Sequence, residues 1–408
     1  MQRRRFTQAL AAAGALSAVS PFGIVRAQAQ KLRVGVILPR SGYLSFIGQS
    51  CQKGADLAPG VLKEMLGVDL ELMNADFESN VDTARTRAER LIQEGANVLV
   101  GPFDSGAAAA IAQVAEQRGV PFVINIAAAP QITEQGYKFV FRNFQTAGDI
   151  VRNGLALIGD LFQATNTVPR TAVFMHVNDT FGQAMAKGIG AFMPKMTQLP
   201  FKVVDTISYD PAAKDLTVEV SKAKASKADF VLLVCRLNDA ILLRREMVKQ
   251  RWSPMGIVSP GSPGMYEEQY FKALGKLSEH AISNVPWYNP NANLTKVVEK
   301  AFLKQNPKDK LVFHGLNAGF TFEALLIAAD AFKRARTTDP KALADAIRQT
   351  SIADKMTLGG PIKFNQKGQV EGIGSACVQN RNLVPTVVLP ANAAAAKPIF
   401  PVPEYKKT

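Results

Sequence analysis

Residues 32–38 read LRVGVIL, an apolar and β-branched run that stops at Pro39. A short, continuously apolar run of this kind is typical of a strand that is buried on both faces of a parallel sheet. The loop after it carries Ser41 and Gly48, and a helical stretch follows to about Leu66. A strand followed by a helix is the repeating unit of an α/β fold, which is the fold class that we expect.

The strand and helix alternation continues through two further stretches of the chain. In the first, we expect strands at 68–73, 97–100 and 120–126 and helices at 81–94 and 107–117. In the second, we expect strands at 171–175, 201–207, 230–234 and 257–258 and helices at 181–192, 216–225 and 239–250. This repeated order predicts parallel sheets with helices on both faces. The two stretches span about 115 and 130 residues, so each is long enough for a core of its own.

The remaining part of the chain holds elements that must complete these two sheets. They are a strand at 281–285, helices at 317–334 and 340–349, and a β-rich stretch from Met356 with a hairpin at 365–368. Because both strands and helices are left over, the chain should cross between two lobes more than once. The segment 391–408 is rich in alanine, proline and lysine, so we expect a loosely held tail.

The N-terminus has the layout of a signal peptide at residues 1–29. A basic start at 3–5 precedes an apolar stretch at 9–22, and the small-x-small pattern at 27–29 places cleavage near Ala29. The run from Arg3 to Phe6 also resembles a twin-arginine export signal, and a general secretory signal is the alternative. No later segment reaches the roughly 18 apolar residues of a membrane span, so we expect a soluble periplasmic protein.

Composition excludes several classes of function. The net charge of +14 falls to +10 without the four arginines of residues 1–29, but the lysines are scattered singly, so we expect no nucleic-acid partner. The cysteines show no CxxC spacing, and at most one pair could form, so we expect no essential disulfide. The histidines show no metal-ligand spacing, which predicts no metal and no cofactor. The residues concerned are Cys51, Cys235 and Cys377, and His176, His280 and His314.

The chain also lacks the sequence motifs of common enzymes. It has no GxGxxG, Walker A, HExxH or GxSxG phrase. Only three histidines are available for general acid and base catalysis. We therefore expect no enzymatic activity.

A series of short phrases, in this order, resembles the periplasmic substrate-binding proteins of the leucine/isoleucine/valine-binding type over residues 32–388. The phrases are VGV at 34–36 with Ser41, Gly42 and Gly48, GPFDS at 101–105, GVP at 119–121 with Ala127 and Ala128, NDTFG at 178–182, ADFV at 228–231, and GGPIKF at 359–364 with Gly368. The resemblance implies a type I periplasmic binding fold: two doubly wound parallel-sheet lobes joined by three hinge crossings, near Phe144, Ser283 and Lys355. Lobe I would hold 31–144 and 284–355, and lobe II would hold 145–283 and 356–390.

The resemblance also implies a function and partners. Such a protein captures a small molecule between its lobes and delivers it to the permease and ATPase subunits of an ABC importer. We expect a monomer. A ligand-sensing module for a signalling partner, built on the same fold, is an alternative.

Ser105 is the first candidate ligand-binding residue. It follows a strand and a Gly-Pro turn at the start of a helix, where free N–H groups and the helix dipole favour an anion. Gly106 has no Cβ and would allow close approach of a ligand, and the resemblance places the ligand carboxylate here. An ordinary serine N-cap is the alternative, and both can hold at once. The neighbouring residues Asp104, Ile126 and Ala127 complete this part of the site.

Two further positions depart from the amino-acid-binding relatives. The resemblance implies a threonine where this chain has Ala128, and an acidic residue where it has Gly261. Without these acceptors, a buried ammonium group would cost several kcal/mol. We therefore expect an organic carboxylate, and a branched-chain or other aliphatic amino acid is the alternative.

The other candidate residues suggest the rest of the ligand. Arg236 follows the strand at 230–234 and could bind a second carboxylate or a ligand oxygen, or it could be a structural arginine paired with an acid. Phe181, Tyr43, Phe46 and Ile47 would surround an apolar or aromatic body, although any one of them could be a core residue.

Overall fold

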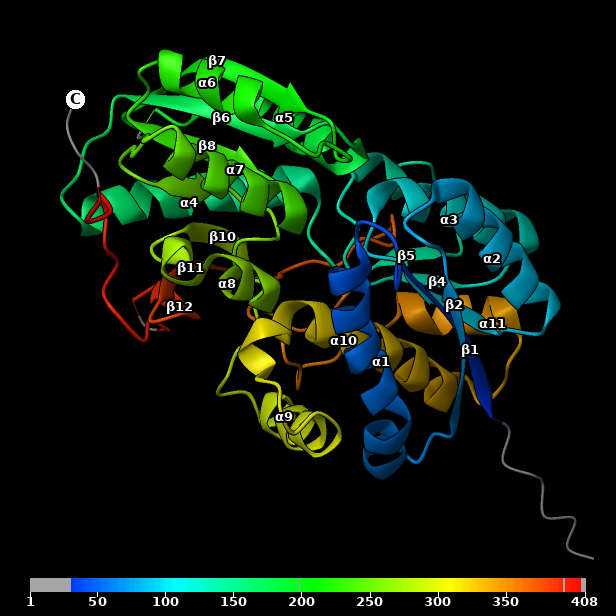
Figure 1. Ribbon diagram of the computed structural model, residues 1–408. Helices are drawn as coiled ribbons and strands as arrows, with labels where there is room; N and C mark the ends of the chain where they lie inside the picture. The colour runs from blue at the N-terminus through cyan, green and yellow to red at the C-terminus, as the bar shows by residue number, and fades with distance from the viewer. Residues whose placement is uncertain (1–30, 198, 392, 405–408) are drawn as a thin grey trace, which may run out of the picture. The chain divides into compact units, whose positions relative to one another are not determined.

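The computed structural model describes residues 31–197, 199–391 and 393–404 (Figure 1). The expected signal peptide at 1–29 lies outside these residues. Within them the strands form two sheets, as the alternation of strands and helices predicts. No helix in the described ranges is long and apolar enough to cross a membrane.

The first sheet is fully parallel and has the strand order β2-β1-β3-β4-β5. Its strands are β1 (Leu32–Leu38), β2 (Leu70–Asp76), β3 (Val98–Gly101), β4 (Phe122–Ile124) and β5 (Val140–Arg142). The helices of this lobe are α1 (Ser45–Leu66), α2 (Val81–Gln93), α3 (Ser105–Arg118), α9 (Asn293–Gln305), α10 (Gly315–Ala335) and α11 (Pro340–Arg348). The run that opens the chain's fold, β1, is therefore an inner strand.

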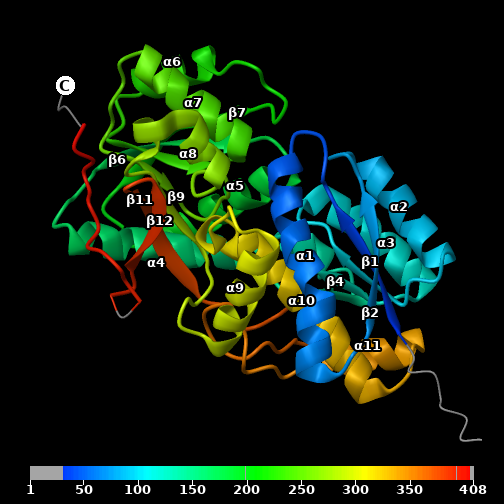
Figure 2. The ribbon, with the colours of Figure 1, turned by 60° about the horizontal axis from the view of Figure 1, so that its bottom comes forward.

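Helices cover both faces of this sheet. Alternate side chains of a strand point to opposite faces, so Val34 and Val36 pack with α1 and α10 while Ile37 packs with α2 and α3. The helices α1 and α10 lie side by side (Figure 2). A Cβ at Gly54 of α1 would stand 2.1 Å from the backbone oxygen of Ala318, so only glycine permits this close approach.

The second sheet has the order β12-β11-β10-β9-β8-β6-β7. Its strands are β6 (Thr171–Val177), β7 (Lys202–Tyr209), β8 (Phe230–Val234), β9 (Ile257–Ser259), β10 (Ile282–Pro286), β11 (Ser375–Arg381) and β12 (Val384–Leu389). Its helices are α4 (Ala147–Ala164), α5 (Thr180–Phe192), α6 (Thr217–Ala225), α7 (Leu237–Lys249) and α8 (Glu268–Leu274). The strands β6 to β10 are parallel, and β11 and β12 add an antiparallel edge. The packing again alternates: α4 and α5 cover one face, and α6, α7 and α8 cover the other.

The chain passes three times between the two lobes. The first two follow β5 and β10. The third lies between Val370 and β11, because the chain after α11 still pairs with the first lobe, where the Val370 N–H donates to the Arg142 carbonyl oxygen. The second begins after Pro286, a few residues beyond Ser283. The exact lobe boundaries given above stay predictions.

A buried carboxylate joins two of these passages. Glu323 of α10 accepts hydrogen bonds from the backbone N–H of Met356 at 2.7 Å and of Thr357 at 2.9 Å, and from Asn143 Nδ2 at 3.4 Å. Asn143 belongs to the first passage, and Met356 pairs with the second, since the Asn289 N–H donates to the Met356 carbonyl oxygen. Burial raises the pKa of the Glu323 carboxyl.

The C-terminal segment differs from our expectation of a loose tail. Phe400 is buried, and its ring packs 5.2 Å from Phe162, between centroids. The backbone N–H of Val402 donates to Met255, and Gln379 bonds both backbone groups of Ile399. An aromatic residue and a paired backbone thus hold residues 399–402 against the second lobe, which the alanine and proline content alone did not indicate.

Candidate ligand-binding site

A pocket lies where the carboxyl ends of strands from both sheets meet. It encloses about 350 Å³ of empty space. Its lining residues are Phe103, Ile126, Ala128, Phe144, Phe181, Arg236, Gly261, Pro263, Tyr266, Val285, Pro286 and Leu316. Almost all of them stand at or just after the end of a parallel strand, which is where open α/β sheets bind ligands. A mostly apolar lining with few polar groups is typical of a small-molecule site.

Among the described residues that line the pocket, Arg236 is the charged one. Its side chain connects the two lobes. Its Nε and Nη2 donate to Asp179 Oδ2 at 3.0 and 2.8 Å, and Nη2 lies 3.6 Å from Asp104 Oδ2. Burial lowers the pKa of Arg236, but the Asp179 and Asp104 carboxylates raise it more, so the guanidinium stays charged. Arg236 is therefore paired with an acid, as the alternative of a structural arginine predicts, and its partner is Asp179. The Asp239 carboxylate instead accepts from the Arg236 backbone N–H.

The same two carboxylates begin two helices. Asp104 Oδ1 accepts from the Ala107 N–H at 2.9 Å and is the N-cap of α3, and Asp179 Oδ1 accepts from the Gly182 N–H at 2.7 Å and is the N-cap of α5. Each aspartate thus uses one oxygen for its helix and turns the other toward Arg236. The N-cap of α3 is Asp104, one residue before the serine cap that we considered.

Two aromatic rings enclose the guanidinium. The Arg236 Cζ lies 4.6 Å from the centroid of Phe181 and 5.3 Å from that of Phe103. Such contacts between a cation and a ring stabilise the buried charge. Phe103 has a φ of 85°, which is rare outside glycine, and its N–H donates to Asn125 Oδ1 at 2.9 Å.

Ser105 is fully buried, next to the pocket but not in its lining. Its Oγ accepts from the backbone N–H groups of Ala128 and Ala129 at 3.2 and 3.3 Å. The hydroxyl hydrogen has no acceptor among the described residues, so it remains able to donate. Gly106 also stands outside the lining, beside Thr180 of the other lobe.

Arg142 holds the loop that supplies Ile126 and Ala128 to the pocket. Its guanidinium is fully buried and donates to the carbonyl oxygen of Ala129 at 2.7 Å and to Gln369 Oε1 at 2.6 Å. Burial lowers its pKa to about 9. Nothing in the sequence pattern singled out this residue.

Gly261 lies in the lining, and its backbone permits no other residue. Its φ is 146°, and a Cβ at this position would stand 1.9 Å from Ile150 Cγ2. An acidic side chain therefore cannot occupy this place without displacing α4.

The remaining candidates lie apart from the pocket. Ile47 and Ala127 are buried in the core of the first lobe, on opposite faces of its sheet. Phe46 is half exposed and lines a separate cavity with Glu267, and Tyr43 accepts a hydrogen bond from Asn238 Nδ2 at 3.4 Å through its backbone oxygen. The lining residues that sequence reasoning missed are Phe103, Phe144, Pro263, Tyr266, Val285, Pro286 and Leu316, although their places after strands could have indicated several of them.

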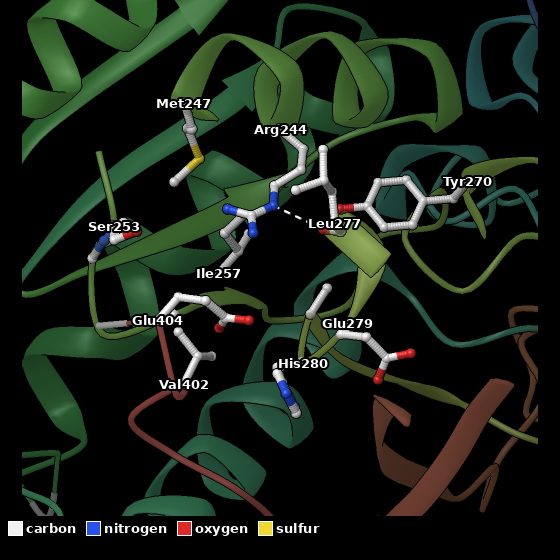
Figure 3. Close-up of a pocket in the computed structure, with 13 residues that line it drawn as sticks. Arg244, Met247, Ser253, Ile257, Tyr270, Leu277, Glu279, His280, Val402 and Glu404 are labelled. Atoms are coloured by element: carbon white, nitrogen blue, oxygen red, sulfur yellow. Dashed lines mark hydrogen bonds between the residues drawn. The ribbon is translucent and has the colours of Figure 1, made fainter. Parts of the chain in front are cut away.

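A second pocket, shown in Figure 3, lies at the opposite ends of the strands of the second lobe. Residues just before β9 and β10 contribute to it, together with Arg244 and Tyr270. Arg244 donates to the backbone oxygen of Leu277 at 2.8 Å, the bond that is dashed in Figure 3. Because ligands of open α/β sheets bind at carboxyl ends, the pocket between the lobes is the better candidate.

Comparison with known proteins shows the family of the chain. A model of the periplasmic binding protein family matches residues 31–377. The chain belongs to this family. It is similar to the Leu/Ile/Val-binding protein homolog 8 of Brucella abortus, with 24% identity over 90% of this chain and 93% of that protein. It is also similar to the leucine-, isoleucine-, valine-, threonine- and alanine-binding protein of Pseudomonas aeruginosa, with 23% identity over 90% of this chain and 95% of that protein.

Solved structures of this periplasmic binding protein family share the fold. A solute-binding protein of an ABC transporter from R. palustris, in complex with benzoate, has a TM-score of 0.75 at 21% identity and covers 90% of this chain and 98% of its own. A branched-chain amino acid transporter substrate-binding protein from Streptococcus pneumoniae, in complex with isoleucine, has a TM-score of 0.75 at 18% identity and covers 87% and 98%.

Membership of the family confirms the expected class of function. The protein is a substrate-binding protein of the ABC transporter type that takes a small molecule, and its relatives are binding proteins and not enzymes. The family also implies an exported, periplasmic protein.

Proposed function

We propose that this periplasmic binding protein captures an organic carboxylate with an apolar or aromatic body and delivers it to the permease and ATPase subunits of an ABC importer. We propose further that residues 1–29 are its export signal, of the twin-arginine type. The observation that carries the choice of ligand is the chemistry of the pocket between the lobes. Its described lining holds aromatic and aliphatic side chains and a cation, Arg236, but no carboxylate.

The anionic end of the ligand has donors available. Arg236 Nη1 has no hydrogen-bond partner in the described part of the chain, so it can bind a carboxylate oxygen while Nε and Nη2 stay on Asp179. The free hydroxyl hydrogen of Ser105, behind Ala128, supports a second contact once the lobes open and close. Asp104 and Gly106 belong to this end of the site as its framework, and Ala127 holds the loop between Ile126 and Ala128 from the core of the first lobe.

The other end of the pocket suits an apolar body. Phe144, Phe181 and Tyr266 offer ring faces and edges, and Leu316 closes the side that faces α10. Aromatic surfaces of this kind contribute large contact areas at small entropic cost. The benzoate complex of the R. palustris protein, which has the same fold, is in keeping with such a ligand.

A panel of ligands tests the proposal. Thermal shifts are measured for the wild-type protein with benzoate, hydroxylated benzoates, short aliphatic carboxylates, leucine, isoleucine and valine. A ligand at 100 times its Kd stabilises a fold by about 2.7 kcal/mol, which such a scan detects. We expect stabilisation by aromatic carboxylates. Stabilisation by leucine or valine alone would reject the proposed ligand class.

Substitutions then locate the ligand. Arg236→Met, measured by calorimetry on protein whose folding is verified by circular dichroism, should abolish binding of the best carboxylate, because it removes the cation of the lining. Arg244→Met is the matched control, since Arg244 is on the same helix, α7, but lines the pocket of Figure 3. Equal loss in both variants, or loss in neither, would place the ligand elsewhere.

An aliphatic amino acid is the second candidate, and one observation favours it. Glu267 of the second lobe is buried beside Tyr266, and one of its oxygens accepts from Asn317 Nδ2 at 3.0 Å. Its carboxyl lines the neighbouring cavity and lies next to Tyr266 of the solute pocket, so an ammonium group that passes Tyr266 could reach it. Binding of leucine that is lost in Glu267→Gln and kept in Glu299→Gln, a change at an exposed position of α9, would establish this alternative.

A further inference from the structure

Three potential metal ligands converge in a cavity that is separate from the solute pocket. Each of Glu268, Asp309 and His314 offers one ligand atom, and these atoms lie within 4.8 Å of one another. They come from distant parts of the sequence: Glu268 begins α8, and Asp309 and His314 stand on either side of the short helix η4 (Leu311–Phe313). The three residues line a cavity together with Ser50, Lys53 and Lys272.

His314 is the unusual member of this group. It is only 8% exposed, and its Nδ1 is bonded to Ser50 Oγ at 2.9 Å, whereas its Nε2 is buried and has no hydrogen-bond partner in the described chain. With the proton on Nδ1 and the Ser50 oxygen as acceptor, Nε2 presents a free lone pair. This is how histidines that bind metals are usually oriented by a second partner.

Two lysines form ion pairs with the carboxylates of the group. Lys53 pairs with Asp309, and Lys272 Nζ lies 3.0 Å from Glu268 Oε2. The Lys272 side chain is 60% exposed, so it can turn into solvent at little cost. A metal ion must compete with these ammonium groups, and this competition gives the site a measurable signature.

We propose that Glu268, Asp309 and His314 bind a divalent transition metal ion of the Zn²⁺ class. One imidazole nitrogen and two carboxylate oxygens form a ligand set that suits Zn²⁺, with solvent as the fourth ligand. Mg²⁺ and Ca²⁺ prefer oxygen ligands alone, so we expect them to bind poorly. Sequence spacing hides this site, because the three residues meet only after the chain has folded.

The position of the site gives the metal a function. The helix α8 packs with α7 in the second lobe, while η4 leads into α10 of the first. The rings of Phe271 and Phe313 already touch across this junction, with centroids 5.3 Å apart. A metal bound to Glu268 on one side and to Asp309 and His314 on the other would hold the two lobes in the closed arrangement. It would therefore raise the affinity for any solute that binds this arrangement.

Metal titrations of the untagged protein test the proposal without knowledge of the solute. Zn²⁺ binding is followed by calorimetry, and Co²⁺ binding by visible absorption, which reports a low-coordinate nitrogen and oxygen site. We expect one Zn²⁺ per chain. His314→Gln should weaken binding by at least about 100-fold, and Ser50→Ala, which loses only the orienting bond, by about 10-fold. Lys272→Met should tighten binding by about 10-fold, because it removes a competing charge.

The control is His280→Asn, which removes a histidine outside this group. It should leave the Zn²⁺ affinity unchanged. Equal affinity of the wild type and of His314→Gln, or weaker binding by Lys272→Met, would overturn the proposal. Absence of Zn²⁺ binding by a wild-type protein that still responds to carboxylates would overturn the metal site alone and leave the proposed solute function intact.

Discussion

Replacement of Arg236 by methionine should destabilise the protein strongly at neutral pH. Methionine keeps the apolar stem between Phe103 and Phe181 but leaves the Asp179 and Asp104 carboxylates buried without their cation. Arg236 is only 5% exposed, so solvent screens the pair little. Removal of one partner from a buried ion pair costs about 3–5 kcal/mol. Loss of the contacts with the two rings adds roughly 1 kcal/mol.

A double-mutant cycle separates the charge from the packing. Asp179→Asn keeps the N-cap of α5, since asparagine caps helices as well as aspartate does. In the double variant one stranded carboxylate is gone, so we expect a coupling free energy of about 2–3 kcal/mol. Urea unfolding, followed by circular dichroism and by the fluorescence of the two tryptophans, measures each corner of the cycle.

The pH dependence of the same variants provides an independent check. Burial raises the pKa of Asp104, so in Arg236→Met this stranded carboxyl takes up a proton as the pH falls and the deficit shrinks. The loss of stability should therefore be smaller at pH 4 than at pH 7. A variant that unfolds within about 0.5 kcal/mol of the wild type at pH 7, or a deficit that does not depend on Asp179, would refute this reasoning.

Three further substitutions have defined outcomes. Gly261→Asp should lower the melting temperature by several degrees and abolish solute binding, because its Cβ meets Ile150; a well-folded variant would contradict the geometry. Burial raises the pKa of Asp239 to about 6, so this carboxyl ionises at a lower pH in the unfolded state than in the folded state. The wild type should therefore lose about 3 kcal/mol of stability between pH 4 and 7, relative to Asp239→Asn. Parallel curves of stability against pH for the two proteins would argue against this effect. Glu323→Gln should speed amide hydrogen exchange at Met356 and Thr357 about 30-fold. This factor corresponds to roughly 2 kcal/mol, the free energy lost when a neutral amide replaces the charged acceptor. Unchanged exchange would show that other contacts hold this segment.

The fold could be predicted because its signals are local. Continuous apolar runs such as 32–38 and 230–234 are strands, and both became inner strands with helices on each face. The helix α4 and the short strand β5 were not anticipated. A three-residue strand carries no periodicity, and the role of α4 depends on its packing against strands more than 100 residues away.

The site was less accessible to sequence reasoning because its chemistry is long-range. The positions of Ile126, Ala128, Phe181, Arg236 and Gly261 after strands placed them in the pocket lining. The partner of Arg236 and the role of Arg142 depend on side chains that meet only across loops, so no spacing predicts them. The start of a helix indicates Ser105 as a ligand-binding residue, but the Asp104 carboxylate already accepts the hydrogen bond of the Ala107 N–H at this helix terminus.

The hydrogen bonds of Glu323 to Asn143 in the first connecting segment and to Met356, which pairs with the second, have a mechanical consequence. A torsion change at Asn143 must be matched at Met356, or the carboxylate loses a partner in a place that water does not reach. The two segments therefore bend together, and domain rotation is restricted to few axes. Under the proposed function, the importer subunits would then meet one reproducible surface rather than a family of twisted ones.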